Sequence, residues 1–209
     1  MNKVMRPASE LPPDPAAQAP TPGVSVLNIA NALTVLRLVL VPFFAIALLA
    51  HDGHDTTTRI WAWAIFAVAS ITDRLDGELA RKHNLVTSFG KLADPIADKA
   101  LTGTALVALS TLGDLPWWVT IVVLCREIGV TLLRFWVIQH GVIPASRGGK
   151  AKTLAQGIAI GLYVLPLTGV WASGRVAVMA VAVALTIITG VDYIGRAVRL
   201  RRISNAQAR

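Results

Sequence analysis

The sequence has a single cysteine, Cys125, and few charged residues. One cysteine excludes an internal disulfide framework and a zinc site built from several cysteines. Charged residues make up 15% of the 209 residues, whereas an ordinary globular chain has about 25%. Acidic residues are the scarcer kind, with 12 Asp and Glu against 20 Lys and Arg and a net charge of +8. This composition argues against a soluble globular domain.

Apolar residues take the place of the missing charges. They make up 54% of the chain, and the mean hydropathy is +0.59. A nucleic-acid-binding protein could share the basic net charge, but not the long apolar runs that accompany it here. The sequence therefore predicts an integral membrane protein without a nucleic-acid partner.

The first 26 residues differ in character from the rest of the chain. Residues 7–22 hold six of the eleven prolines, so neither the apolar stretch of a secretory signal nor a stable helix fits there. We expect a disordered Pro-rich cytoplasmic tail at 1–26, a six-helix membrane domain at 27–200 and a basic cytoplasmic tail at 201–209.

Apolar stretches recur from Asn28 onward at the spacing of helical hairpins. They predict an all-α fold with six transmembrane helices, at 28–51, 58–82, 93–113, 116–139, 151–172 and 175–197. Basic residues in short loops stay on the cytoplasmic side of a membrane. With both termini inside, 18 of the 20 Lys and Arg lie at the inner side, and only Arg59 and Arg175 lie outside. We therefore predict a topology with the N- and C-termini in the cytoplasm.

Four of the predicted spans are too short to cross the membrane without burying charge. A spanning helix needs about 20 apolar residues, and each of the first four spans has a shorter uncharged run. Each run is bounded on its cytoplasmic side by charged residues: Arg37, Asp73, Asp98, Lys99, Arg126 and Glu127. Ionised groups at such depth are costly unless they face water or one another. The run lengths therefore predict a shared polar chamber that opens to the cytoplasm.

Four aspartates lie on the two helices beside this chamber. Asp73 and Asp76 are three residues apart at the end of the second span, and Asp94 and Asp98 are four apart in the third. Each pair therefore occupies one helix face. Converging carboxylates repel one another unless they are neutralised, and Mg²⁺ or Mn²⁺ prefers oxygen ligands. The alternative is a set of buried salt bridges with nearby basic residues: Arg74, Arg81, Lys99 and Arg126.

The segment from Asp73 to Asp98 resembles the signature of a known family. It fits D-x2-D-G-x2-A-R-x8-G-x3-D-x3-D, the pattern of the CDP-alcohol phosphatidyltransferases, at every fixed position. The likeness covers roughly residues 27–165 and is greatest to bacterial members whose acceptor is glycerol 3-phosphate. It implies a homodimeric, six-helix membrane enzyme that transfers the phosphatidyl group of CDP-diacylglycerol to an alcohol and releases CMP.

The resemblance also implies roles for individual residues. Two divalent cations, Mg²⁺ or Mn²⁺, would be bound by Asp73, Asp76, Asp94 and Asp98. Asp98 would in addition act as the catalytic base toward the acceptor hydroxyl. The cytidine nucleotide would lie along residues of the first two spans: Asn31, Thr34, Asp76, Gly77, Ala80 and Arg81. The small side chains of Gly77 and Ala80 would let the substrate approach the backbone.

An acceptor such as glycerol 3-phosphate carries its own phosphate and needs a second anion site. The candidates are basic residues of the fourth and fifth spans: Arg126, Arg134, Lys150 and Lys152. Arg126 and Arg134 are eight residues apart, which is close to two helical turns and places them on nearly one face. Lys150 and Lys152 follow a Gly-Gly pair that can approach a phosphate closely. The alternative for these residues is cytoplasmic anchoring of the helix ends.

Other functions remain open from the sequence. The same chemistry could use phosphatidylglycerol as acceptor, giving cardiolipin, or an inositol phosphate. A divalent-cation transporter could also use aspartates within the membrane, but a transport path needs polar residues through the outer half of the helices, which is nearly without them. We therefore expect an enzyme of phospholipid synthesis in a bacterial inner membrane, surrounded by membrane lipids, with its active site facing the cytoplasm.

Overall fold

The computed structural model describes residues 29–82, 88–137 and 147–207, and most of their side chains. Within these ranges the chain forms six α-helices, one short 3-10 helix and no strand. The elements are α1 (Ile29–Leu49), η3 (Ala50–Gly53), α2 (Thr56–Lys82), α3 (Ser88–Thr111), α4 (Trp117–Val137), α5 (Arg147–Val164) and α6 (Val170–Gln207). The predicted all-α fold is confirmed, while the predicted tail at 1–26 lies outside the described residues.

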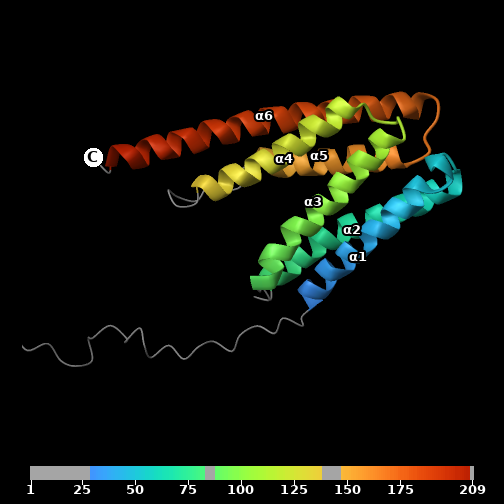
Figure 1. The fold of residues 1–209 in the computed structure, drawn as a ribbon, viewed down its shortest axis with the longest axis horizontal. Coiled ribbons are helices and arrows are strands. Elements are labelled where there is room, and N and C mark those ends of the chain that lie inside the picture. The colour runs from blue at the N-terminus through green and yellow to red at the C-terminus, as the bar shows by residue number, and fades with distance from the viewer. Residues whose placement is uncertain (1–28, 83–87, 138–146, 208–209) are drawn as a thin grey trace, which may run out of the picture.

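The helices form two groups of three (Figure 1). In one group α1 packs against α2 and α3, and in the other α6 packs against α4 and α5. The groups meet at the end that carries η3 and the turns at 112–116 and 165–169, which we call the closed end. They diverge toward the end where α1 begins and α6 finishes, which we call the open end. Both described termini of the bundle therefore lie at the open end.

Burial in this bundle differs from that in a soluble protein. Arg37 and Lys152 are buried, at 0% and 3% exposed, whereas Ile46 and Trp171 are 67% and 76% exposed. Every helix also presents large apolar side chains outward. A soluble monomer rarely leaves so extensive an apolar surface to water. The distribution is that of a chain whose outer surface is covered by lipid.

Two helices are long and apolar enough to cross a membrane by length and composition alone. They cover Asn31–Gly53 and Val170–Arg201 within the part of the chain that the structure describes. Of the four spans with short uncharged runs, α1 passes this test over the described residues, whereas α2, α3 and α4 do not.

A buried network of polar contacts holds the closed end together. Arg59 of α2 is 5% exposed and donates through Nε to the Gly53 carbonyl at 2.5 Å and through Nη1 to the Tyr163 carbonyl at 3.4 Å. Its Nη2 forms a salt bridge with Asp114. Arg175 of α6 lies 4.0 Å from the other oxygen of Asp114, with its guanidinium 4.8 Å from the centre of the Tyr163 ring. The network therefore connects η3, α2, the turn after α3, α5 and α6.

The connection from α1 to α2 depends on a glycine and a helix cap. Gly53 has a φ of +70°, and a Cβ added there would approach Leu112 to 2.4 Å, so only glycine fits without a shift of its neighbours. Asp55 then begins α2 by accepting a hydrogen bond from the backbone N–H of Thr58 at 2.8 Å. This tight turn places Arg59 against η3.

The break between the last two helices differs from the prediction. The sequence predicts a turn at 172–174, but α5 ends at Val164 and α6 begins at Val170. Pro166 explains the earlier break, because proline lacks the backbone donor and disfavours helical geometry in the residue before it. The helices α3 and α5 begin earlier than predicted, at Ser88 and Arg147, and α6 continues to Gln207 rather than ending at 197.

Candidate active site

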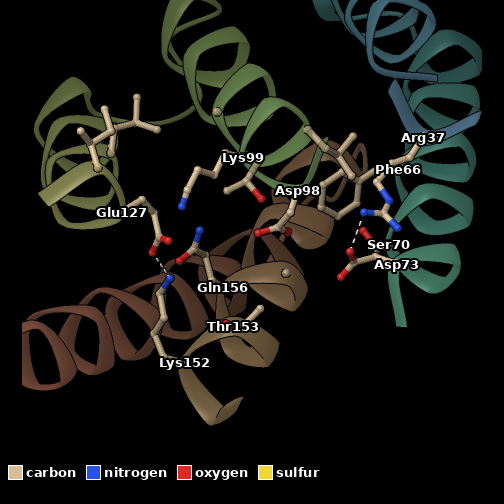
Figure 2. A pocket seen from close by; sticks show the side chains of 16 residues that line it. Arg37, Phe66, Ser70, Asp73, Asp98, Lys99, Glu127, Lys152, Thr153 and Gln156 are labelled. Atoms are coloured by element: carbon tan, nitrogen blue, oxygen red, sulfur yellow. Dashed lines mark hydrogen bonds and ion pairs between the residues drawn. The ribbon is translucent and has the colours of Figure 1, made fainter. Parts of the chain in front are cut away.

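A cavity of about 210 Å³ lies between the two groups of helices, and residues from α1 to α5 line it. Most of the labelled residues in Figure 2 are polar: Arg37, Ser70, Asp73, Asp98, Lys99, Glu127, Lys152, Thr153 and Gln156. Five of the six charged residues that the run lengths placed in a shared chamber line this cavity. The sixth, Arg126, does not. The structure thus confirms that these helices share a polar chamber.

Asp73 forms a salt bridge with Arg37 across the interface of α1 and α2. Nη1 of Arg37 lies 2.6 Å from Oδ1 of Asp73. The Arg37 side chain is fully buried, whereas that of Asp73 is 38% exposed, so part of the carboxylate remains accessible. The basic residues considered from the sequence were neighbours on α2, but the observed partner comes from another helix.

Asp98 of α3 projects into the middle of the cavity. Figure 2 shows it between the Arg37–Asp73 pair on one side and the Glu127–Lys152 pair on the other. Among the described side chains it forms no hydrogen bond or salt bridge, and the charged groups of Arg37, Asp73, Lys99 and Glu127 act on it. Its carboxylate is therefore available to a substrate that enters the cavity.

Glu127 of α4 binds two cationic side chains at once. Its Oε1 accepts hydrogen bonds from Lys152 of α5 and from Nη1 of Arg126, the latter at 3.0 Å. Arg126 also reaches α6, where its Nη2 donates to Thr189 at 3.2 Å. Gly190 permits this close passage, because a Cβ there would lie only 3.2 Å from Cγ of Arg126. Arg126 is thus directed toward α6, while Lys152 lines the cavity.

Gln156 is a cavity residue that sequence reasoning missed. It is 5% exposed, and its Oε1 is buried without a hydrogen-bond partner within the described ranges. It lies one turn after Lys152, on the same face of α5. A lone glutamine in an apolar helix was the available signal, since a buried amide needs a partner. Its oxygen can accept a hydrogen bond from a substrate hydroxyl.

The predicted site residues fall into three sets. Asp73, Asp98 and Lys152 line the cavity. Asn31 and Thr34 are buried on the two turns of α1 before Arg37, and Lys150 is exposed at the open end of α5. These three residues and Arg126 do not line the cavity. The remaining predictions concern side chains outside those described: Asp76, Gly77, Ala80, Arg81, Asp94 and Arg134.

The cavity contains oxygen ligands of the kind that a hard divalent cation binds. Asp73 and Asp98, from adjacent helices, both present carboxylate oxygens to the same space, and oxygen is the ligand that Mg²⁺ and Mn²⁺ prefer. Asp76 and Asp94 lie about one turn away along the same two helices. Among the described side chains, which exclude these two, no group of three acidic, His or Cys residues forms a metal site. The four-aspartate site therefore stays a prediction.

Comparisons with known proteins identify the family to which the chain belongs. Residues 27–188 match the family model described as CDP-alcohol phosphatidyltransferase. A probable phosphatidylglycerophosphate synthase from Mycobacterium tuberculosis is 60% identical over 174 residues, which covers 83% of each chain. Enzymes named CDP-diacylglycerol-glycerol-3-phosphate 3-phosphatidyltransferase are similar as well. The one from Bacillus subtilis is 36% identical over 86% of this chain and 100% of its own, and the one from Escherichia coli is 37% identical over 81% and 94%. The chain belongs to the CDP-alcohol phosphatidyltransferase family.

Proposed function

We propose that the chain transfers the phosphatidyl group of CDP-diacylglycerol to sn-glycerol 3-phosphate, giving phosphatidylglycerophosphate and CMP. The observation that carries this proposal is the single cavity to which Asp73, Asp98 and Lys152 contribute from three helices. It combines acidic groups suited to phosphoryl transfer with a buried cation suited to an anionic acceptor. The relatives from Bacillus subtilis and Escherichia coli, whose names state this reaction, support the choice of substrates.

The lipid nucleotide would bind at the α1–α2–α3 side of the cavity. The family generally depends on divalent cations. Two such ions would be held here by Asp73, Asp76, Asp94 and Asp98. When bound, such ions neutralise the diphosphate and make CMP a better leaving group. Arg37 holds one of these carboxylates, that of Asp73, in a salt bridge. The cytidine nucleotide would extend along Asn31, Thr34, Gly77, Ala80 and Arg81.

The acceptor would bind at the α4–α5 side. Lys152 is buried there, and its ammonium group would contact the phosphate of glycerol 3-phosphate. Oε1 of Gln156 would accept a hydrogen bond from a glycerol hydroxyl. Arg134 and the exposed Lys150, nearer the open end, would add positive charge along the entry route, and Arg126 would support Lys152 through Glu127.

Asp98 would take the proton of the attacking hydroxyl. The oxygen of that hydroxyl forms a bond to the phosphorus that carries the diacylglycerol group, and the bond from this phosphorus to the bridging oxygen breaks. CMP leaves with the bridging oxygen. An alcohol is too weak an acid to ionise before attack, so its proton passes to Asp98 as the new bond forms. Asp98 then releases the proton to water.

In the membrane, all six helices would span the bilayer as a homodimer subunit, with both termini in the cytoplasm. The open end would face the cytoplasm of a bacterial inner membrane, where glycerol 3-phosphate and CMP are dissolved. Exposed tryptophans near the starts of α2, α4 and α6, toward the closed end, support placing that end at the opposite membrane interface, because tryptophan gathers at both interfaces. They are Trp61, Trp63, Trp117, Trp118 and Trp171.

The proposed reaction is tested with the purified chain, CDP-diacylglycerol and one acceptor at a time, by following CMP release. We expect glycerol 3-phosphate to react fastest with Mg²⁺ or Mn²⁺ present, and a chelator to stop the reaction until either ion is restored. Faster reaction with phosphatidylglycerol or an inositol phosphate would contradict the proposed acceptor. Release of CMP in the presence of excess chelator would contradict the cation requirement.

Replacing Lys152 with alanine tests the acceptor site. We expect the KM for glycerol 3-phosphate to rise by about 10- to 100-fold, because a charge-assisted contact of about 1.5–3 kcal/mol is lost. The KM for CDP-diacylglycerol should change much less. Lys150→Ala is the matched comparison, with a smaller expected effect because this lysine is exposed and does not line the cavity. A larger effect on the lipid nucleotide than on the acceptor would place Lys152 elsewhere in the mechanism.

A further inference from the structure

A hydrogen bond joins the two groups of helices at the level of the polar cavity. Nζ of Lys99, on α3, donates to Oγ1 of Thr131, on α4, over 2.8 Å. Near the closed end, where the groups meet, the same two helices are joined by a 2.7 Å hydrogen bond between the hydroxyls of Ser110 and Thr120. Lys99 precedes Ser110 by eleven residues, which is about 16 Å along α3 toward the open end. The lysine therefore bridges the groups where they diverge.

The hydroxyl that accepts this hydrogen bond is held in one orientation. Oγ1 of Thr131 donates its own proton to the carbonyl oxygen of Glu127 at 2.8 Å. A hydroxyl has one proton to donate and two lone pairs that accept, so the lone pairs of Thr131 are left to receive Lys99. Lys99 lines the cavity, whereas Thr131 does not. The contact thus lies in the wall of the cavity between α3 and α4.

The alternative for Lys99 is that its ammonium group reaches toward water at the open end, as long basic side chains near a membrane interface do. Figure 2 shows instead that the side chain extends from α3 toward Glu127 of α4, and its ammonium group bonds Thr131. A long side chain suits this place because the gap between the helices widens toward the open end. The direction of Lys99 therefore favours a bridge between helices.

This bridge lies between the two halves of the proposed site. Asp98, the proposed base, directly precedes Lys99 on α3. On the other side, Glu127 accepts a hydrogen bond from Lys152, the proposed contact of the acceptor phosphate. We propose that Lys99 is a positioning residue that, through Thr131, sets the separation of α3 and α4 and hence the distance from Asp98 to the acceptor hydroxyl. This inference rests on the proposed function.

Thr131→Val is the first test, because it removes the hydroxyl but keeps the shape of the side chain, the charge of Lys99 and the lining of the cavity. We expect kcat for CMP release to fall by about tenfold, since a misplacement of about 1 Å can lower the rate by as much as ~10²-fold. The KM values for glycerol 3-phosphate and CDP-diacylglycerol should change little. Thr131→Ser, which keeps the hydroxyl, should retain the kcat of wild type.

Lys99→Met removes the other partner of the same contact. It should lower kcat at least as much as Thr131→Val, and the double variant should be no slower than Lys99→Met alone, because residues in direct contact are not additive. Thr111→Val is the matched control. Thr111 is an exposed residue of α3 whose hydroxyl donates to the Val107 carbonyl of its own helix at 2.9 Å, and it does not line the cavity.

The separation of the two helices can also be measured without turnover. Spin labels on Cys125 of α4 and on the cysteine of an Ile96→Cys variant on α3 report this distance in detergent, since both positions are exposed. Dilution with unlabelled protein restricts the measurement to distances within one chain. In this background Thr131→Val is expected to lengthen or broaden the distance distribution, and Thr131→Ser is expected to leave it unchanged.

Two results would overturn the proposal: a wild-type kcat in Thr131→Val, or a distance distribution that this substitution does not change. A higher KM for glycerol 3-phosphate at unchanged kcat in Lys99→Met would make Lys99 a substrate-binding residue instead. A lower Tm in Thr131→Val with an unchanged distance would show that the contact serves stability alone. Failure of wild type to release CMP would contradict the proposed reaction, and the distance comparison would still decide whether Lys99 and Thr131 hold α3 against α4.

Discussion

Replacing Asp98 with asparagine is expected to lower kcat for CMP release by about 10²- to 10⁴-fold, the usual contribution of a general base. Asparagine has nearly the same shape but accepts no proton at neutral pH. Because Asp98 projects into the cavity and has no partner among the described side chains, little else should change. Binding of CDP-diacylglycerol should be largely retained.

Varying the metal concentration distinguishes the two roles proposed for Asp98, cation ligand and catalytic base. If its loss only weakens cation binding, saturating Mg²⁺ or Mn²⁺ should restore the rate, and the role as base would be wrong. If Asp98 is the base, the rate should stay low at every metal concentration. Asp192→Asn is the control, because Asp192 is an exposed residue of α6 whose carboxylate pairs with Arg196 at 3.0 Å and does not line the cavity.

Replacing Arg59 with methionine is expected to destabilise the protein by roughly 3–5 kcal/mol, since breaking a buried ion pair leaves its partner charge uncompensated. Arg59 is 5% exposed and donates to two backbone carbonyls and to Asp114. In the variant, Asp114 retains only the longer contact with Arg175. Thermal unfolding in detergent should show the loss as a clearly lower Tm.

An exposed arginine of the same chain provides the comparison for Arg59. Arg196→Met breaks an ion pair whose side chains are about half exposed, and such pairs contribute about 0–1 kcal/mol. Its Tm should stay close to that of wild type. Below its melting temperature the Arg59 variant should keep most of its kcat, because the closed end lies apart from the cavity. A Tm equal to that of Arg196→Met would show that the network contributes little to stability.

The polar chamber could be predicted from the sequence because the depth of a charge follows from the length of the run beside it. Arg37, Asp73, Asp98, Lys99 and Glu127 were placed together by this reasoning, and they line one cavity. The end of α5 could also have been predicted from the sequence, since Pro166 is a stronger helix-breaking signal than the Ala-Ser-Gly at 172–174. The similarity of the motif to the family was confirmed by the family model.

The partners of individual side chains could not be predicted in the same way. Asp73 pairs with Arg37, which is 36 positions earlier in the chain, because α1 packs on α2. Arg126 turns toward α6 because Gly190 leaves it room and Thr189 accepts its hydrogen bond. These pairings depend on contacts between helices that are distant in sequence, and the spacing of residues along the chain does not predict them.

The contrast between the two ends of the bundle also bears on the sidedness of catalysis. Arg59, Asp114 and Arg175 connect five segments at the closed end, so we expect a water-soluble acceptor to reach Asp98 from the open end. In vesicles with every chain inserted in the same orientation, only glycerol 3-phosphate on the open-end side should react. The new phospholipid would then arise in the leaflet on that side, and its appearance in the other leaflet would require a separate step.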